Sequence, residues 1–143
     1  MIKKIINWLM DKEKLQKLDQ TKLKKALPKI NYKVLNHAKY YYMDAEFEST
    51  TLTNFRKILQ KDFTNWRIYN KDFDCDNFAF KLYSNLRSKY PKLTIGVVLN
   101  SKHAYNVFVD KYGKAWYIEP QTDKVQSYSK LAKQYKPISL IIL

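Results

Sequence analysis

The sequence predicts an α+β domain in which helices come first and a small antiparallel sheet follows. The chain has 143 residues, the length of one ordinary domain, and 45% of them are hydrophobic. Apolar residues recur at helical spacing up to about residue 90, and strand-like runs follow. Because no linker or internal repeat interrupts the pattern, residues 1–143 are expected to form a single domain.

The N-terminal segment is expected to be helical and basic. Apolar residues recur every three or four positions in residues 2–18, which predicts an amphipathic helix. Thr21 is a candidate cap for a second short helix, and Pro28 ends that helix. Residues 1–28 are therefore expected to form a basic amphipathic helical extension. Such a segment either packs on the domain or contacts a membrane surface or a partner.

Two further helices are expected in the middle of the chain. Thr53 begins one helical stretch, and Asp74 or its neighbour caps another that runs to about Tyr90. Pro91 closes the second helix. The intervening residues 64–73 are irregular and aromatic. Three aromatic side chains either line a cleft or lie buried: Trp66, Tyr69 and Trp116.

The strands are expected in the last third of the chain. Leu93–Leu99 and His103–Asp110 are rich in β-branched and aromatic residues. Ala115–Glu119 follows across a turn at residues 111–114, which predicts a hairpin. The last two elements expected are a short helix and a terminal strand: Ser127–Tyr135 and Pro137–Leu143.

The composition excludes several classes of protein. Two Gly, four Pro and 15% aromatic residues argue against a disordered or collagen-like chain. The single cysteine excludes an internal disulfide framework and a multi-cysteine zinc site. No apolar run approaches the roughly 18 residues of a membrane span. The short N-terminal apolar stretch is followed by no small-residue cleavage site, so no signal peptide is expected.

The net charge favours polyanionic partners such as nucleic acid, acidic lipid or teichoic-acid-like polymers. The 27 Lys and Arg residues outnumber the 13 Asp and Glu residues, which gives a formal charge of +14. The same bias towards Lys, Ile, Asn and Tyr is typical of proteins from AT-rich genomes. No helix-turn-helix, zinc-finger or RNA-recognition signature accompanies the charge. Nucleic-acid binding therefore rests on charge alone.

Three residues in the order cysteine, histidine and acid could carry nucleophilic chemistry. Cys75 lies at an expected helix start, where unpaired backbone N–H groups stabilise negative charge. His103 begins one strand and Glu119 ends the next, so a hairpin would bring them together. The alternative is that Cys75 is a small core residue and His103 has no special function. The adjacent carboxylates of Asp74 and Asp76 also disfavour a thiolate.

Three motifs in this chain resemble those of known cysteine peptidases. They are Phe-Asp-Cys-Asp-Asn-Phe-Ala at 73–79, His-Ala-Tyr-Asn at 103–106 and Ile-Glu-Pro at 118–120. They are similar to motifs of the bacterial transglutaminase-like cysteine peptidases and of the papain-like protease domain of a mushroom agglutinin. Small phage-encoded proteins with these motifs look more similar still. The resemblance covers roughly residues 66–123.

The resemblance implies a papain-like or transglutaminase-like fold and a cysteine hydrolase that cleaves peptide or amide bonds. Cys75 would be the nucleophile, His103 the general base and acid, and Glu119 the residue that orients the imidazole. The peptidase family has Asp where this chain has Glu119. Asn70 is a weak candidate for the oxyanion hole. The substrate would be a peptide or a cell-wall amide, and the location cytoplasmic or virion-associated.

The resemblance also implies a candidate calcium site next to the cysteine. Asp74, Asp76 and Asn77 match the positions of calcium ligands in the peptidase family, and oxygen ligands suit Ca²⁺. The alternative is that Asp74 caps the helix while Asp76 lies at its positive end. Calcium is therefore a candidate cofactor, although the sequence requires none.

Two other functions are compatible with the sequence. A fold does not imply an activity, so the chain could be a non-catalytic structural or binding protein of a phage or mobile element. The third hypothesis is a basic nucleic-acid-binding protein.

Overall fold

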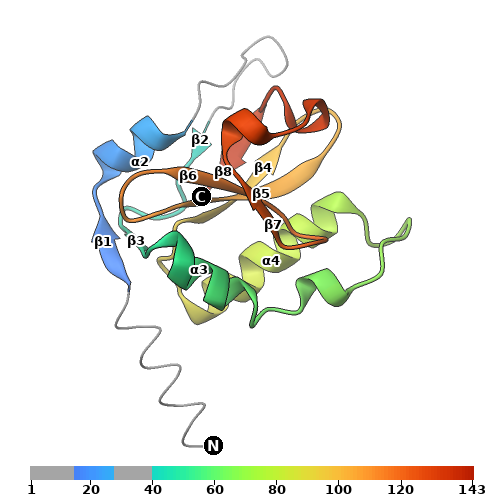
Figure 1. Ribbon diagram of the computed structural model, residues 1–143, viewed down its shortest axis with the longest axis horizontal. Helices are drawn as coiled ribbons and strands as arrows, with labels where there is room; N and C mark the ends of the chain where they lie inside the picture. Colours follow the sequence, from blue (N-terminus) through green and yellow to red (C-terminus); the bar gives the residue numbers. More distant parts are fainter. Residues whose placement is uncertain (1–14, 28–39) are drawn as a thin grey trace, which may run out of the picture.

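The computed structural model describes residues 15–27 and 40–143 (Figure 1). A six-stranded sheet has the order β2-β8-β4-β5-β6-β7, and β1 and β3 form a separate two-stranded sheet. The strands are β1 (Gln16–Leu18), β2 (Tyr40–Tyr41), β3 (Phe47–Ser49), β4 (Ile95–Leu99), β5 (Ala104–Val109), β6 (Ala115–Glu119), β7 (Lys124–Gln126) and β8 (Leu140–Ile142). The α-helices of the described residues are α2 (Gln20–Ala26), α3 (Leu52–Leu59) and α4 (Cys75–Lys89).

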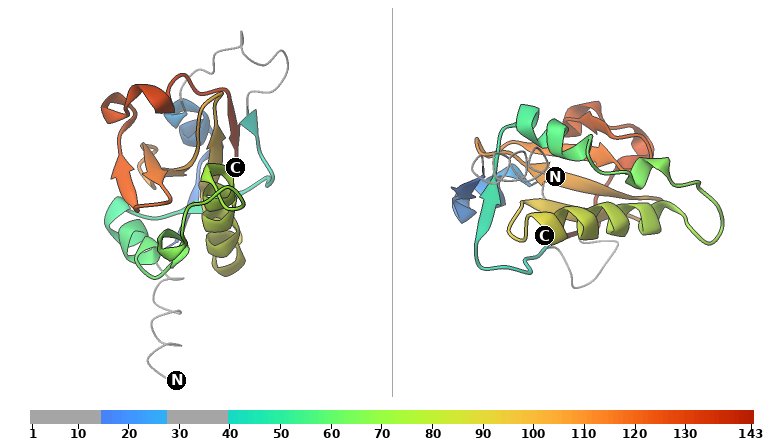
Figure 2. Two further views of the ribbon diagram at one scale, coloured as in Figure 1. Left: turned by 90° about the vertical axis from the view of Figure 1, so that its right-hand side faces the viewer. Right: turned by 90° about the horizontal axis from the view of Figure 1, so that it is seen from below.

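One face of the large sheet packs against α3 and α4. Phe55 of α3 and Leu82 of α4 join Phe108 of β5 and Ile118 of β6 in a single buried cluster. The rings of Phe55 and Phe108 stack with centroids 3.9 Å apart. Figure 2 shows α4 running alongside the strands that it covers. This face is therefore a helix-covered layer of the core.

The opposite face packs against α2 and the segment that leads into β8. Tyr105 and Val107 of β5 share a buried cluster with Leu23 of α2 and with Leu131 and Ile138. Successive residues of a strand point to opposite faces. Every residue of β5 is buried because both faces of the sheet are covered.

Helix α4 forms where the sequence predicts it, and this prediction is confirmed. Asp74 is its N-cap, and the Oδ1 atom of Asn77 accepts a hydrogen bond of 3.1 Å from the backbone N–H of Asp74. Phe78, Leu82 and Leu86 are buried at intervals of four residues on one helix face. The helix ends at Lys89, two residues before Pro91.

The strands predicted after residue 93 are also confirmed, with small changes at their ends. Strands β5 and β6 pair antiparallel around the turn at residues 111–114, as the hairpin prediction requires. Strand β8 lies within the predicted terminal strand. Two helix starts differ from those predicted. Asp19 caps α2 in place of Thr21, and α3 begins at Leu52, one residue before the predicted Thr53, with Thr51 as its cap.

The predicted order of helices followed by a small antiparallel sheet is wrong. Strands β1, β2 and β3 all precede α3, and β2 pairs parallel with β8 at the edge of the larger sheet. The helix predicted for residues 2–18 is replaced at Gln16–Leu18 by β1, while its residues 2–14 lie outside the described residues. Strands of two or three residues are too short to show an alternating pattern in the sequence. They form because distant segments of the chain pair with them.

The described part of the predicted N-terminal extension belongs to the core. Leu18, Leu23 and Leu27 are buried in the cluster that contains Tyr105. Residues 15–27 therefore contribute to the packing of the domain, whereas residues 1–14 and 28 lie outside the described residues. Within the described ranges, no helix is long and apolar enough to cross a membrane.

Candidate functional site

The β5–β6 hairpin brings His103 and Glu119 into contact. His103 directly precedes β5 and Glu119 ends β6, so both lie at the open end of the hairpin. The imidazole Nε2 and the carboxylate Oε2 are 2.7 Å apart. The Tyr135 hydroxyl donates to the same Oε2 at 2.7 Å, and the backbone N–H of Gln121 donates to Oε1 at 3.2 Å. The predicted pairing of His103 with an acid is therefore present.

The surroundings of Glu119 favour its charged form. Burial alone raises the pKa of this carboxyl, because the side chain is only 11% exposed. The hydrogen bonds from His103 and Tyr135 outweigh that effect and hold the pKa of Glu119 below its usual value. Burial, followed by the contact with Glu119, raises the pKa of Tyr135. The Tyr135 hydroxyl therefore remains a hydrogen-bond donor at neutral pH.

The thiol of Cys75 lies beside an apolar cluster that includes Ala104, the first residue of β5. Cys75 is the first residue of α4, and its half-buried side chain packs against Ala79, Val97 and Ala104. Among the described residues, no hydrogen bond joins the thiol to His103. The structure thus pairs His103 with Glu119 and places Cys75 against an apolar cluster.

The remaining predicted site residues organise the backbone before and within the first turn of α4. The Oδ1 atom of Asn70 accepts hydrogen bonds from the backbone N–H groups of Asp72 and Phe73, at 2.8 and 3.0 Å. The neighbouring Asp76 raises the pKa of the Asp74 carboxyl, chiefly through a side-chain hydrogen bond. Across the described residues, no cluster of three or more His, Cys, Asp or Glu side chains could hold a metal ion. Calcium binding by Asp74, Asp76 and Asn77 (an amide ligand outside that search) stays a prediction.

A groove of about 430 Å³ lies between residues 61–67 and α4. It is lined by polar and cationic side chains together with one aromatic ring: Lys61, Asp62, Phe63, Thr64, Arg67, Lys81, Asn85, Ser88 and Lys89. Phe63 and Trp66 are 58% and 75% exposed, and their ring centroids are 4.6 Å apart. The groove therefore adjoins a pair of exposed aromatic rings.

Hydrogen bonds hold this aromatic segment against α4. The Oδ1 atom of Asp62 accepts from the backbone N–H of Thr64 at 2.9 Å. The Nδ2 atom of Asn85, on α4, donates to Oδ2 of Asp62 at 2.8 Å. Residues Thr64–Trp66 form a single 3₁₀ turn. These contacts keep Phe63 and Trp66 at the surface beside the groove.

The polar face of α4 is the sequence feature that could have indicated this groove. Lys81, Asn85, Ser88 and Lys89 recur at helical spacing on the polar face of α4. Trp66 and Tyr69 are exposed, so of the two positions that the sequence allows for them, the buried one is wrong. Trp116 instead packs against the core and donates from Nε1 to Asp110 Oδ2 at 2.9 Å.

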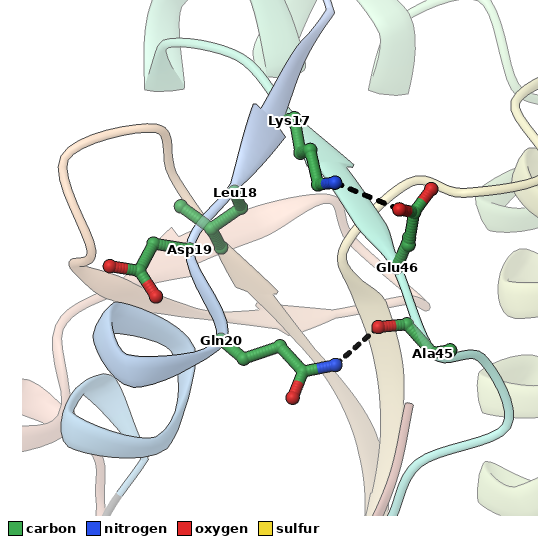
Figure 3. A pocket seen from close by; sticks show the side chains of 6 residues that line it. All are labelled: Lys17, Leu18, Asp19, Gln20, Ala45 and Glu46. Carbon is green, nitrogen blue, oxygen red and sulfur yellow. Dashed lines mark hydrogen bonds and ion pairs between the residues drawn. The ribbon is translucent and has the colours of Figure 1, made fainter.

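A second hollow, of about 570 Å³, lies between β1, the start of α2 and the segment before β3 (Figure 3). Its charged and amide groups contact one another. Lys17 Nζ lies 2.8 Å from Glu46 Oε1, and the side-chain amide of Gln20 donates to the carbonyl of Ala45. The polar side chains of Lys17, Gln20 and Glu46 therefore already contact other groups of the protein.

Solved structures with a similar fold include the following two. One is a complex of PSL1a with E64; it is 19% identical, the match covers 89% of this chain, and the TM-score is 0.69. The other is the Polyporus squamosus lectin bound to the human-type influenza-binding epitope Neu5Acα2-6Galβ1-4GlcNAc; it is 20% identical, covers 91% and has a TM-score of 0.62. The chain spans about half of each structure, 51% and 50%. No family model and no curated protein matches the chain.

These comparisons contradict the predicted family and activity. One of the similar structures is a lectin, and no family model, whether of a peptidase or of another class, matches the chain. The papain-like fold, the cysteine hydrolase and its peptidase or amidase reaction are corrected accordingly. Nothing in the comparisons supports a phage or viral origin. The individual roles predicted for Cys75, His103, Glu119 and Asn70 stay predictions that the comparisons do not test.

The replacement Glu119→Gln should lower stability at neutral pH by about 1.5–3 kcal/mol, because it weakens charge-assisted hydrogen bonds. A lowered pKa in the folded state stabilises the protein above the unfolded pKa, and the benefit disappears as pH falls through the folded pKa. The difference between wild type and variant should therefore shrink below about pH 4. Thermal unfolding measured from pH 3 to 8 checks this.

Glu46→Gln is the matched control for Glu119→Gln. Glu46 is 50% exposed and contacts Lys17 and Lys92 at the surface. Its loss should cost much less than that of Glu119, because exposed ion pairs contribute little to stability. Equal effects of the two substitutions, or a Glu119→Gln effect that does not vary with pH, would contradict the stabilising role of buried Glu119.

Proposed function

We propose that this protein binds carbohydrate at the groove between residues 61–67 and α4. One observation carries the proposal: the exposed ring of Phe63 lines a groove with hydrogen-bonding side chains, and the exposed ring of Trp66 packs against Phe63. A large exposed aromatic surface next to polar groups is typical of a binding site.

The chemistry of the groove suits a sugar. A pyranose ring presents an apolar C–H face that packs on an aromatic ring, while its hydroxyl groups need hydrogen-bond partners. Asn85 Nδ2 donates to Asp62 and the Ser88 hydroxyl donates to the carbonyl of Ser84, so their side-chain oxygens remain to accept from sugar hydroxyl groups. Lys81 supplies N–H donors. One side of a sugar would therefore contact Trp66 and its edge would contact α4.

The fold comparison supports the same function. A similar structure is a lectin with a bound glycan. The glycan belongs to that other protein, about half of which this chain covers. The proposal for this chain therefore rests on its own aromatic surface, with the lectin name as supporting evidence.

Trp66→Ala should weaken the binding of a carbohydrate about tenfold or more, which corresponds to about 1.4 kcal/mol. The wild-type chain is screened on a panel of immobilised glycans that includes Neu5Acα2-6Galβ1-4GlcNAc, and hits are measured by isothermal titration calorimetry. Tyr112→Ala is the matched control, because Tyr112 is 70% exposed but belongs neither to the groove lining nor to the Phe63–Trp66 ring pair beside it. It should bind like wild type. The proposal fails if no glycan binds, or if Trp66→Ala binds as tightly as wild type.

A further inference from the structure

We infer that the groove beside α4 selects anionic carbohydrates, those that carry sulfate or carboxylate groups, over neutral ones. The inference rests on the proposed carbohydrate-binding function and adds the class of ligand. It follows from the charges that line the groove. The cationic side chains are Lys61, Arg67, Lys81 and Lys89, and Asp62 is the carboxylate among the lining residues.

The carboxylate of Asp62 already accepts hydrogen bonds from other groups of the protein. Both oxygens of Asp62 accept hydrogen bonds, one from the backbone of Thr64 and one from Asn85. Within the described residues, Lys81 and Lys89 form no ion pair with a carboxylate. Their charges therefore remain available, and the groove has an excess of positive charge.

The cations on α4 are spaced for a ligand with more than one anionic group. Lys81 and Lys89 are two helical turns apart, which is about 12 Å along the helix axis. Asn85 and Ser88 lie between them on the same face and can contact hydroxyl groups. The order of cation, neutral polar group and cation matches an oligosaccharide with charged groups along its length.

Arg67 adds a cation on the opposite wall. Its guanidinium carbon lies 4.7 Å from the centroid of the Phe73 ring, so the aromatic contact restrains the side chain. A guanidinium resting on a ring keeps its N–H edge for sulfate or carboxylate, which it can bind through two hydrogen bonds. An anionic group in the groove would thus lie between Arg67 and the lysines of α4.

The test compares a dextran oligosaccharide with its sulfated derivative of the same length, using the full chain and calorimetry. The sulfated form should bind wild type at least about tenfold more tightly, and added salt should weaken it. Lys81→Gln with Lys89→Gln should cost the sulfated form about tenfold and the neutral form much less. Lys102→Gln with Lys133→Gln is the matched control, because these lysines line a different hollow. It should leave both affinities near wild type.

Several outcomes would refute the selection of anionic carbohydrates. One of them would also refute carbohydrate binding itself. Equal binding of neutral and sulfated dextran, with both dependent on Trp66, would leave carbohydrate binding intact and refute charge selection. Failure of both dextrans while another glycan binds would also refute it. Single-stranded DNA that binds as tightly as sulfated dextran, with the same loss in the Lys81 and Lys89 variant, would identify a general polyanion site. Absence of binding by any glycan would refute the carbohydrate function itself.

Discussion

Replacement of Phe108 by alanine is expected to lower the free energy of unfolding by about 3–5 kcal/mol. The Phe108 ring is fully buried and stacks on Phe55 at an interplanar angle of 4°. This contact joins β5 to α3 in the same cluster that holds Leu82 of α4. Removal of the ring leaves a cavity that all three elements line. Urea unfolding at pH 7, followed by circular dichroism, measures the loss.

Phe63→Ala is the control for Phe108→Ala. Phe63 is the same residue type but is exposed, so its removal should change stability by less than about 0.5 kcal/mol. A loss below about 1 kcal/mol in Phe108→Ala would mean that β5, α3 and α4 do not share a core.

Gly96→Ala should destabilise the sheet by about 1–3 kcal/mol, because extra atoms in a packed core force the backbone to shift. A Cβ at position 96 would lie 2.6 Å from the backbone oxygen of Ile142 and 2.9 Å from Cδ2 of Leu143. The backbone oxygen cannot rotate away, so β8 must move from β4. Thermal unfolding measures the effect. A melting temperature equal to that of wild type would show that β8 does not approach β4 so closely.

The elements that the sequence predicts correctly are those whose signals lie within the segment itself. Helix α4 has an N-cap at Asp74, a four-residue apolar repeat and a nearby proline, and all three signals lie within the segment itself. The β5–β6 hairpin is similar, because a short turn joins two strands that pair with each other. That hairpin explains why the contact between His103 and Glu119 could be predicted.

The parts that were missed depend on distant partners. Strand β1 pairs with β3, about thirty residues away, and β2 pairs with β8 near the end of the chain. Segments this short have too few residues for an alternating pattern, and a periodic run of apolar residues predicted a helix at Gln16–Leu18 instead. Tertiary pairing overrides such weak local preferences.

The candidate site was predicted in part. The motifs name Cys75, His103 and Glu119, and the structure brings the last two into contact. Cys75 packs against an apolar cluster that includes Ala104, the residue after His103, and its catalytic role stays a prediction. The groove was not predicted because its walls come from two segments, residues 61–67 and α4, whose contact is tertiary. Only the exposure of Trp66 in the folded chain separates a binding surface from a core position.

The location of the binding surface is tested most directly by an NMR titration of the isotope-labelled full chain with sulfated dextran oligosaccharide. We expect the largest shifts at the indole N–H of Trp66 and at the backbone amides of residues 62–67 and 81–89, which form the two walls of the groove. The signals of His103 and Glu119 should change little, because neither residue lines the groove. Shifts confined to Cys75, His103 and Glu119, with Trp66 unaffected, would contradict binding at the groove.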